Sequence, residues 1–196
     1  MEAKIGCVIM ASGLGMRFGG NKLLHSFRGN PMIQYILDVT EDFQSRIVVT
    51  RHAEVAELCQ KQNIPVLLHD LPLRSDTVRL GLSALLESEP DLEGCLFAAA
   101  DQPCLKKESI TALCDAFRKE TRFIYRLSFR GVPGNPVLFP RFFFEKLLHL
   151  PEGKGGGFVM KKYPEAVRHT EITDAWELVD ADTPEMLEIL RGLYHD

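Results

Sequence analysis

Residues 5–22 of the chain read IGCVIMASGLGMRFGGNK. The first seven, Ile5 to Ala11, are an apolar run without the polar–apolar alternation of a half-buried strand. Such a run predicts a strand covered on both faces, as in a parallel sheet packed between helices. The rest of the stretch is glycine-rich, so a flexible loop is expected directly after the first strand. Open α/β sheets bind their ligands at this end of their strands.

Outward from this stretch, apolar runs alternate with helical patterns through the first two-thirds of the chain. Further strands are expected at 46–50, 65–68 and 95–100, and helices at 32–42, 53–62, 76–87 and 107–120. Continuous apolar strands separated by helices predict a doubly wound α/β fold, with a mostly parallel sheet and helices on both faces. This is the Rossmann-like arrangement.

The alternation of apolar strands and helices ends after residue 120. Strands around a turn are expected at 123–129 and 136–139, helical patterns at 141–150 and 157–162, and a last helix from Thr183 with Pro184 in its first turn. We interpret residues 121–196 as a smaller β/α elaboration of the same domain, so that 1–196 form a single domain.

Composition excludes several classes of partner. The 196 residues carry a formal net charge of -4, and no basic block is present, which argues against polymeric nucleic acid. No apolar stretch approaches the roughly 20 residues of a membrane span. The five cysteines are scattered and contain no C-x-x-C pair, a pattern that fits a reducing cytosol. We therefore expect a cytoplasmic protein without a membrane segment.

The glycine-rich loop is suited to binding phosphates. Its glycines let backbone N–H groups approach phosphate oxygens, and its two cations can neutralise a triphosphate. The residues expected to contact a nucleotide here are Ala11, Ser12, Gly13, Leu14, Gly15, Arg17 and Lys22. The dinucleotide fingerprint would need glycine at Phe18, and a Walker A loop would need Ser or Thr directly after Lys22. A glycine-rich turn with two solvated cations is the alternative.

Acidic residues lie at two further strand or helix boundaries. Asp101 directly follows the apolar run 95–100, where a carboxylate could hold Mg²⁺ against phosphates. Asp180 and Asp182 precede the last helix and are candidates for the same metal. The alternatives are a turn or helix cap at Asp101 and a helix N-cap at Asp182.

Four short motifs resemble the nucleotidyltransferases of molybdenum cofactor synthesis. Residues 11–22 resemble that family's L-A-A-G-x-x-x-R-M-G-x-x-K signature. The other three are Asp-Gln-Pro at 101–103, Gly-Asn-Pro-Val-Leu-Phe at 134–139 and Asp-Ala-Asp-Thr-Pro-Glu at 180–185. The motifs occur in the family's order and span most of the chain. The resemblance implies a Mg²⁺-dependent transfer of a nucleoside monophosphate to a phosphorylated acceptor, with Arg17, Lys22 and Asp101 as catalytic residues.

The resemblance also bears on the substrates. The Asp-Gln-Pro form is closer to the cytidylyltransferase branch, and residues 74–82 resemble a segment of methylerythritol-phosphate cytidylyltransferases. Together they imply CTP, with Ser75, Asp76 and Thr77 near its base or ribose. Molybdopterin is the implied acceptor and a molybdenum hydroxylase a possible partner. GTP, another transferase substrate or a non-catalytic accessory role are the alternatives.

The sequence departs from the family at Gly153 and Gly157, where an acid and an arginine are usual. The resemblance is therefore weaker for the acceptor than for the nucleotide. On this resemblance, residues 1–120 form the nucleotide-binding part and 121–196 lie on the acceptor side.

Overall fold

The computed structural model describes residues 3–15, 18 and 20–193. Its main strands are β1 (Ile5–Ala11), β4 (Ser45–Thr50), β5 (Val66–Leu68), β6 (Gly94–Ala99), β7 (Ile124–Phe129), β8 (Val132–Pro140) and β9 (Val167–Glu171). The α-helices are α1 (Met32–Val39), α2 (Ala53–Lys61), α3 (Arg74–Ser88), α4 (Lys107–Lys119), α5 (Phe144–Leu148), α6 (Gly156–Lys162) and α7 (Pro184–Gly192). None of the described helices is both long and apolar enough to span a lipid bilayer.

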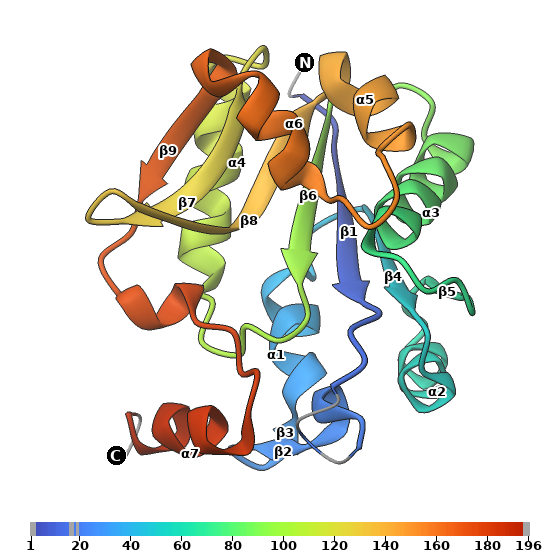
Figure 1. The fold of residues 1–196 in the computed structure, drawn as a ribbon, viewed down its shortest axis with the longest axis vertical. Helices are drawn as coiled ribbons and strands as arrows, with labels where there is room; N and C mark the ends of the chain where they lie inside the picture. Colours follow the sequence, from blue (N-terminus) through green and yellow to red (C-terminus); the bar gives the residue numbers. More distant parts are fainter. Residues whose placement is uncertain (1–2, 16–17, 19, 194–196) are drawn as a thin grey trace.

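The seven main strands form one sheet in the order β5-β4-β1-β6-β8-β7-β9 (Figure 1). Strands β5, β4, β1 and β6 pair in parallel, whereas β8 is antiparallel to both β6 and β7. The sheet is thus mostly parallel, and the predicted doubly wound fold is confirmed. After β1 the chain builds β4 and β5 on one side and then returns to place β6 on the other. The order reverses between β1 and β6, and such a switch point leaves a crevice at the carboxyl ends of the strands.

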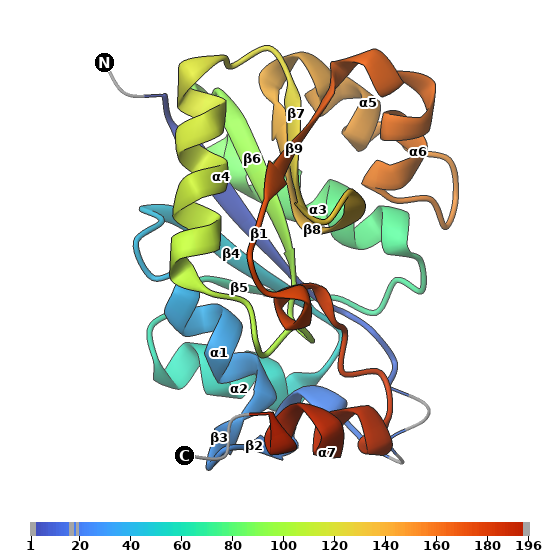
Figure 2. The ribbon, with the colours of Figure 1, turned by 90° about the vertical axis from the view of Figure 1, so that its left-hand side faces the viewer.

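Helices cover both faces of the sheet (Figure 2). On one face, α1, α2 and α4 pack over Cys7, Ile9 and Ala11 of β1. On the other face, α3, α5 and α6 pack over Val8. Alternate residues of β1 therefore enter two different cores, which is why the strand reads as a continuous apolar run.

The last third differs from its prediction in two places. β8 spans Val132–Pro140, longer than the expected 136–139, and extends the hairpin with β7. β9 was not predicted at all. Its sequence, Val167–Glu171 (VRHTE), is mostly exposed and has no buried side chain, so it lacks the apolar signal of a core strand. It pairs with β7 at the edge of the sheet, where backbone hydrogen bonds rather than burial hold it.

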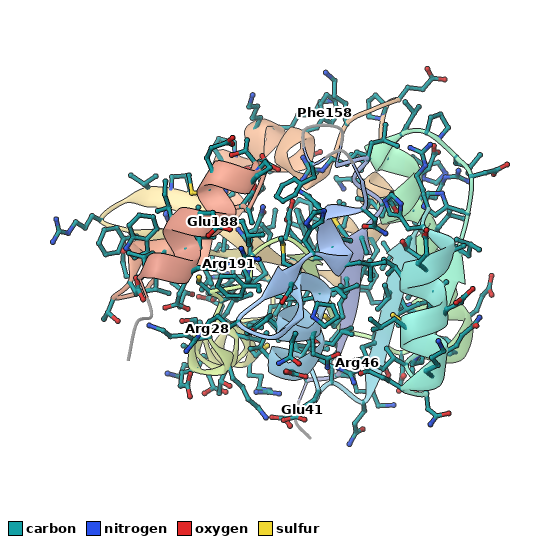
Figure 3. All side chains as sticks on the ribbon, turned by 90° about the horizontal axis from the view of Figure 1, so that it is seen from below. Arg28, Glu41, Arg46, Phe158, Glu188 and Arg191 are labelled. Atoms are coloured by element: carbon teal, nitrogen blue, oxygen red, sulfur yellow. The ribbon has the colours of Figure 1, made fainter. Side chains whose placement is uncertain are left out.

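A small hairpin below the sheet was also missed. β2 (Ser26–Phe27) and β3 (Asn30–Pro31) are joined by Arg28 and Gly29, whose φ angles of 48° and 89° are those of a tight primed turn. Helix α7 packs over this hairpin: Phe27 shares a core with Leu187 and Leu190. Figure 3 shows α7, with Glu188 and Arg191, at the same end of the molecule as Arg28. The Arg191 guanidinium donates to the Ser26 carbonyl, which fastens the C-terminal helix beside the glycine-rich loop.

Gly81 allows α3 to lie close to the sheet. A Cβ added there would lie 2.5 Å from Val8 Cγ1 and 3.0 Å from Val49 Cγ2, closer than packed atoms tolerate. We expect Gly81→Ala to lower the free energy of unfolding by about 1–3 kcal/mol, because the core must be forced apart. Urea unfolding followed by circular dichroism measures this change. Gly157→Ala, also in a helix, is the matched control: a Cβ there meets nothing within 4 Å, so its stability should not fall. Equal losses in both variants would contradict the close packing.

Candidate functional site

Lys22 joins the glycine-rich loop to two carboxylates at the switch point. Its Nζ lies 2.5 Å from Asp101 Oδ2 and 2.8 Å from Asp182 Oδ1. The lysine is buried, with only 6% of its surface exposed, whereas the Asp182 side chain is 55% exposed. Residues predicted from three separate motifs therefore meet in one crevice beyond the ends of β1 and β6.

The backbone brings the C-terminal carboxylates to this crevice. The N–H of Ala181, whose side chain is fully buried, donates to the Asp101 carbonyl at 2.8 Å. Helix α7 then begins with Thr183 as its N-cap, since Thr183 Oγ1 accepts from the Met186 N–H at 3.2 Å. The cap is thus Thr183 and not Asp182, so the alternative role considered for Asp182 is wrong. Its carboxylate is left to pair with Lys22.

The charges of the cluster influence one another. Burial disfavours the Lys22 ammonium, but the attraction and hydrogen bonds of Asp101 and Asp182 outweigh this effect and raise the pKa of Lys22. For Asp180 the surroundings instead disfavour the charged form of the side chain. Partial burial of its carboxyl group, with repulsion from Asp101 and Asp182, raises the pKa of Asp180 to about 6. Burial and the neighbouring carboxylates therefore favour the protonated form of Asp180.

The donor set fits a hard cation. Two carboxylate oxygens, from Asp101 and Asp182, already flank the Lys22 ammonium. Among residues 3–15, 18 and 20–193, no group of three or more His, Cys, Asp or Glu side chains is arranged to hold a metal by itself. Mg²⁺ commonly uses one or two carboxylates and completes its shell with water and substrate phosphates. Asp101 and Asp182 match that pattern.

Two histidines hold the first part of the glycine-rich loop. His69 Nε2 lies 2.9 Å from Ser12 Oγ, and His52 Nε2 lies 2.8 Å from the Gly13 carbonyl. Gly15 has a φ of 57°, a left-handed conformation that favours glycine. The predicted catalytic Arg17 lies outside the described residues. The Ala11 side chain is buried in the core, so only its backbone could face a ligand.

A cavity of about 340 Å³ adjoins the loop, and we call it the loop pocket. Its lining includes the predicted residues Ser12, Gly13, Leu14, Thr77 and Asp101. Sequence reasoning missed two arginines in the same lining, Arg51 and Arg74. Arg51 directly follows β4, and Arg74 is the first residue of α3. Both therefore lie at the carboxyl ends of the parallel strands, where open α/β sheets bind ligands.

Five of the described residues predicted to contact the nucleotide do not line the loop pocket: Ala11, Gly15, Lys22, Ser75 and Asp76. Ser75 is buried, and its Oγ accepts from the Gly153 N–H at 3.1 Å. The Asp76 carboxylate accepts from the Leu73 N–H at 3.1 Å and so caps α3. Ser75 and Asp76 hold the N-terminal turn of α3 in place beside the pocket.

A family model described as the MobA-like NTP transferase domain matches residues 7–171. The chain belongs to this family. The match includes β1 from Cys7 onward, the glycine-rich loop, β4, β5, β6 and Asp101, but ends before Asp180 and Asp182. In this MobA-like chain, the contact between Lys22 and Asp182 therefore joins the family region to a segment beyond it.

A curated protein resembles this MobA-like chain in sequence, and solved structures resemble it in fold. A probable molybdenum cofactor guanylyltransferase from Thermococcus gammatolerans is 26% identical over 113 residues, which cover 57% of this chain and 56% of that protein. The chain thus spans little more than half the length of this curated relative. The fold of the present chain resembles that of Rv0371c from Mycobacterium tuberculosis, with a TM-score of 0.82 and 20% sequence identity. The match covers 98% of the present chain and 99% of Rv0371c. The fold also resembles that of CMP:2-keto-3-deoxy-manno-octonic acid synthetase complexed with CTP, with a TM-score of 0.79, 16% identity and coverage of 97% and 98%.

Proposed function

We propose that this chain is a nucleotidyltransferase that moves a nucleoside monophosphate from a nucleoside triphosphate to a phosphorylated acceptor. One observation carries the proposal: Lys22 of the loop contacts both Asp101 and Asp182 at the switch point of the sheet. A buried cation can stabilise phosphate charge, and two carboxylates can hold a metal ion beside the glycine-rich loop. Phosphoryl transfer depends on this kind of positioning and charge stabilisation. The family assignment and the fold of the CTP-bound synthetase support the same reaction class.

In the proposed reaction, an oxygen of the acceptor's phosphate attacks the α-phosphorus of the triphosphate. A new phosphorus–oxygen bond forms as the bond to the β-phosphate breaks, and pyrophosphate leaves. Lys22 stabilises the negative charge on the phosphates, with Arg17 as the second predicted cation. The backbone of Gly13 to Gly15 lines the phosphates. No covalent intermediate with the protein is needed.

Asp101 and Asp182 would hold Mg²⁺, with Asp180 as the neighbouring substitute. When bound, the ion would supply a positive charge that draws electron density from the α-phosphate oxygens. The two carboxylates would fix its position beside the loop. Lys22, which now neutralises them, would then be available to the phosphates.

For the nucleotide, we propose CTP, supported by Asp-Gln-Pro at 101–103 and by the similarity of residues 74–82 to cytidylyltransferases. GTP is the second candidate, because the curated relative is named a guanylyltransferase. For the acceptor we propose molybdopterin, supported by the same relative's name, with a molybdenum hydroxylase as recipient of the product.

Pyrophosphate release tests the proposal. The protein is incubated with each of the four nucleoside triphosphates, with and without Mg²⁺ and with and without molybdopterin. We expect release with CTP that requires both the metal and the acceptor and is absent with EDTA. Pyrophosphate release with GTP but with none of the other three triphosphates would overturn the choice of CTP. The proposed nucleotidyl transfer would still be supported. CTP binding without release, across a panel of phosphorylated acceptors, would contradict the transferase and support a non-catalytic accessory role.

A further inference from the structure

A second pocket, of about 270 Å³, lies beside the loop pocket, between α3, β6, β8 and α6. The two share three lining residues, Met10, Arg74 and Ala99. They therefore adjoin one another along the ends of β1 and β6. Lys22, Asp101 and Asp182 do not line the second pocket, so it is distinct from the proposed reaction centre.

Arg126 gives the second pocket an unneutralised positive charge. Its guanidinium is partly buried, and its Nε and Nη2 donate to the Gly134 carbonyl at 3.2 Å and 3.0 Å. No carboxylate among the described residues forms an ion pair with it, and burial lowers the pKa of Arg126. An arginine that is partly desolvated without an anion is costly, whereas two charge-assisted hydrogen bonds to a bound anion would offset that cost.

A second arginine and an amide lie in the same lining. Arg74 has no ion pair with any described residue, and its side chain lies against the backbone of Gly155: a Cβ added there would be 3.2 Å from Arg74 Cδ. Asn135, on β8, adds a side-chain amide. Two cations and an amide without a carboxylate favour an anionic occupant over a cationic one.

The remaining lining is apolar. Seven apolar side chains larger than alanine contribute to it: Met10, Val78, Phe97, Val137, Phe139, Leu147 and Met160. A small inorganic anion would leave this surface uncovered. An organic molecule with an apolar body and an anionic group would cover it and also satisfy the arginines.

We propose that the second pocket binds the body of the acceptor through an anionic group other than the phosphate that attacks, and that Arg126 is the residue that selects this group. Calling the bound molecule the acceptor rests on the proposed transfer reaction. The binding itself needs neither nucleotide nor metal. It defines the acceptor class as an organic molecule with a phosphate and a second, separate anionic group.

Binding of a fluorescent probe pair tests the pocket directly. Pterin-6-carboxylate supplies a flat organic body with one anionic group, and pterin supplies the same body without it. Fluorescence anisotropy titrations use the full chain with no nucleotide or metal. We expect the carboxylate probe to bind at least about tenfold more tightly than pterin, the discrimination typical of a charge-assisted hydrogen bond.

Two variants examine the role of Arg126. Arg126→Gln keeps an amide that can donate to the Gly134 carbonyl but removes the charge, and it should abolish the preference for the carboxylate while leaving pterin binding unchanged. Gly157→Glu places a negative charge at the pocket lining, where an added Cβ meets nothing within 4 Å, and should also weaken binding of only the carboxylate probe. Arg118→Gln, on α4 across the sheet, is the control and should bind both probes like the wild type.

Equal binding of the two probes by the wild type would overturn the proposal, as would an unchanged preference in Arg126→Gln. If Arg126→Gln fails to fold, Gly157→Glu decides alone, since a Cβ added at position 157 meets nothing within 4 Å. If the preference depends on Arg126 but no triphosphate releases pyrophosphate, the pocket stands and the transferase function fails. If pyrophosphate is released but the two probes bind equally, the transferase function is supported and the proposal for the second pocket fails.

Discussion

Asp101→Asn is expected to reduce nucleotidyl transfer by about 10²- to 10³-fold, the usual cost of removing one group that stabilises transition-state charge. The substitution keeps the size and shape of the side chain and removes its charge. Asparagine would still accept a hydrogen bond from Lys22 but would bind Mg²⁺ far more weakly. Because the proposed metal would act on the reacting phosphate, the loss should appear in kcat more than in the KM for the triphosphate.

Steady-state pyrophosphate release, measured over a range of Mg²⁺ concentrations, checks this expectation. Raising Mg²⁺ should recover part of the activity of Asp101→Asn. Asp115→Asn, on the exposed surface of α4, is the matched control and should retain wild-type activity. Wild-type kcat in Asp101→Asn would remove this carboxylate from the reaction.

Lys22→Met is expected to affect both activity and stability. Transfer should fall by about 10²-fold or more, since a cation that stabilises the phosphates is lost. The free energy of unfolding at pH 7.5 should fall by about 1–3 kcal/mol, because Asp101 is left partly buried without its counter-ion. The loss stays below that of a fully buried pair, as Asp182 is more than half exposed. Mg²⁺ should stabilise the variant more than the wild type, because the ion replaces the missing positive charge.

The pH dependence of stability provides an independent check on the charges around Lys22. Asp180 has a pKa of about 6 in the folded protein against an ordinary value of 3.8. Between these values the folded state binds more protons than the unfolded state, so this group stabilises the fold at low pH and the effect is lost as pH rises through 6. Without Lys22 the carboxylates repel one another more strongly. The stability difference between Lys22→Met and the wild type should therefore shrink from pH 7.5 to pH 5.5.

Urea unfolding in EDTA at both pH values measures the difference, with Lys119→Met at the end of α4 as the control. A stability penalty that is independent of pH and of Mg²⁺ would show that Lys22 contributes only packing.

The parallel part of the fold could be predicted because burial leaves a strong signal. β1 was predicted at its observed bounds, since every residue in it faces a core or lies between two covered faces. β9 and the β2–β3 hairpin escaped prediction for the opposite reason. β9 has mostly exposed side chains, and two-residue strands such as Ser26–Phe27 are too short to show any periodicity.

The site was predicted only where a local pattern marks it. Lys22 ends the glycine-rich loop that follows β1, Asp101 follows β6, and Asp182 precedes α7, so each could be named before its partners were known. Their contact depends on the path of the C-terminal segment across the sheet, which no short motif encodes. Arg126 gave no signal at all, because a single arginine within a strand becomes distinctive only when the folded chain leaves it partly buried without a carboxylate.

The most direct test is a crystal structure with Mn²⁺ and a non-hydrolysable α,β-methylene analogue of the triphosphate that supports pyrophosphate release. Anomalous scattering locates the manganese independently of the nucleotide. We expect one manganese coordinated by Asp101 and Asp182, with the phosphates on the glycine-rich loop and in contact with Lys22. Manganese bound elsewhere, or a nucleotide outside the crevice with Lys22 still paired to both carboxylates, would contradict the proposed site.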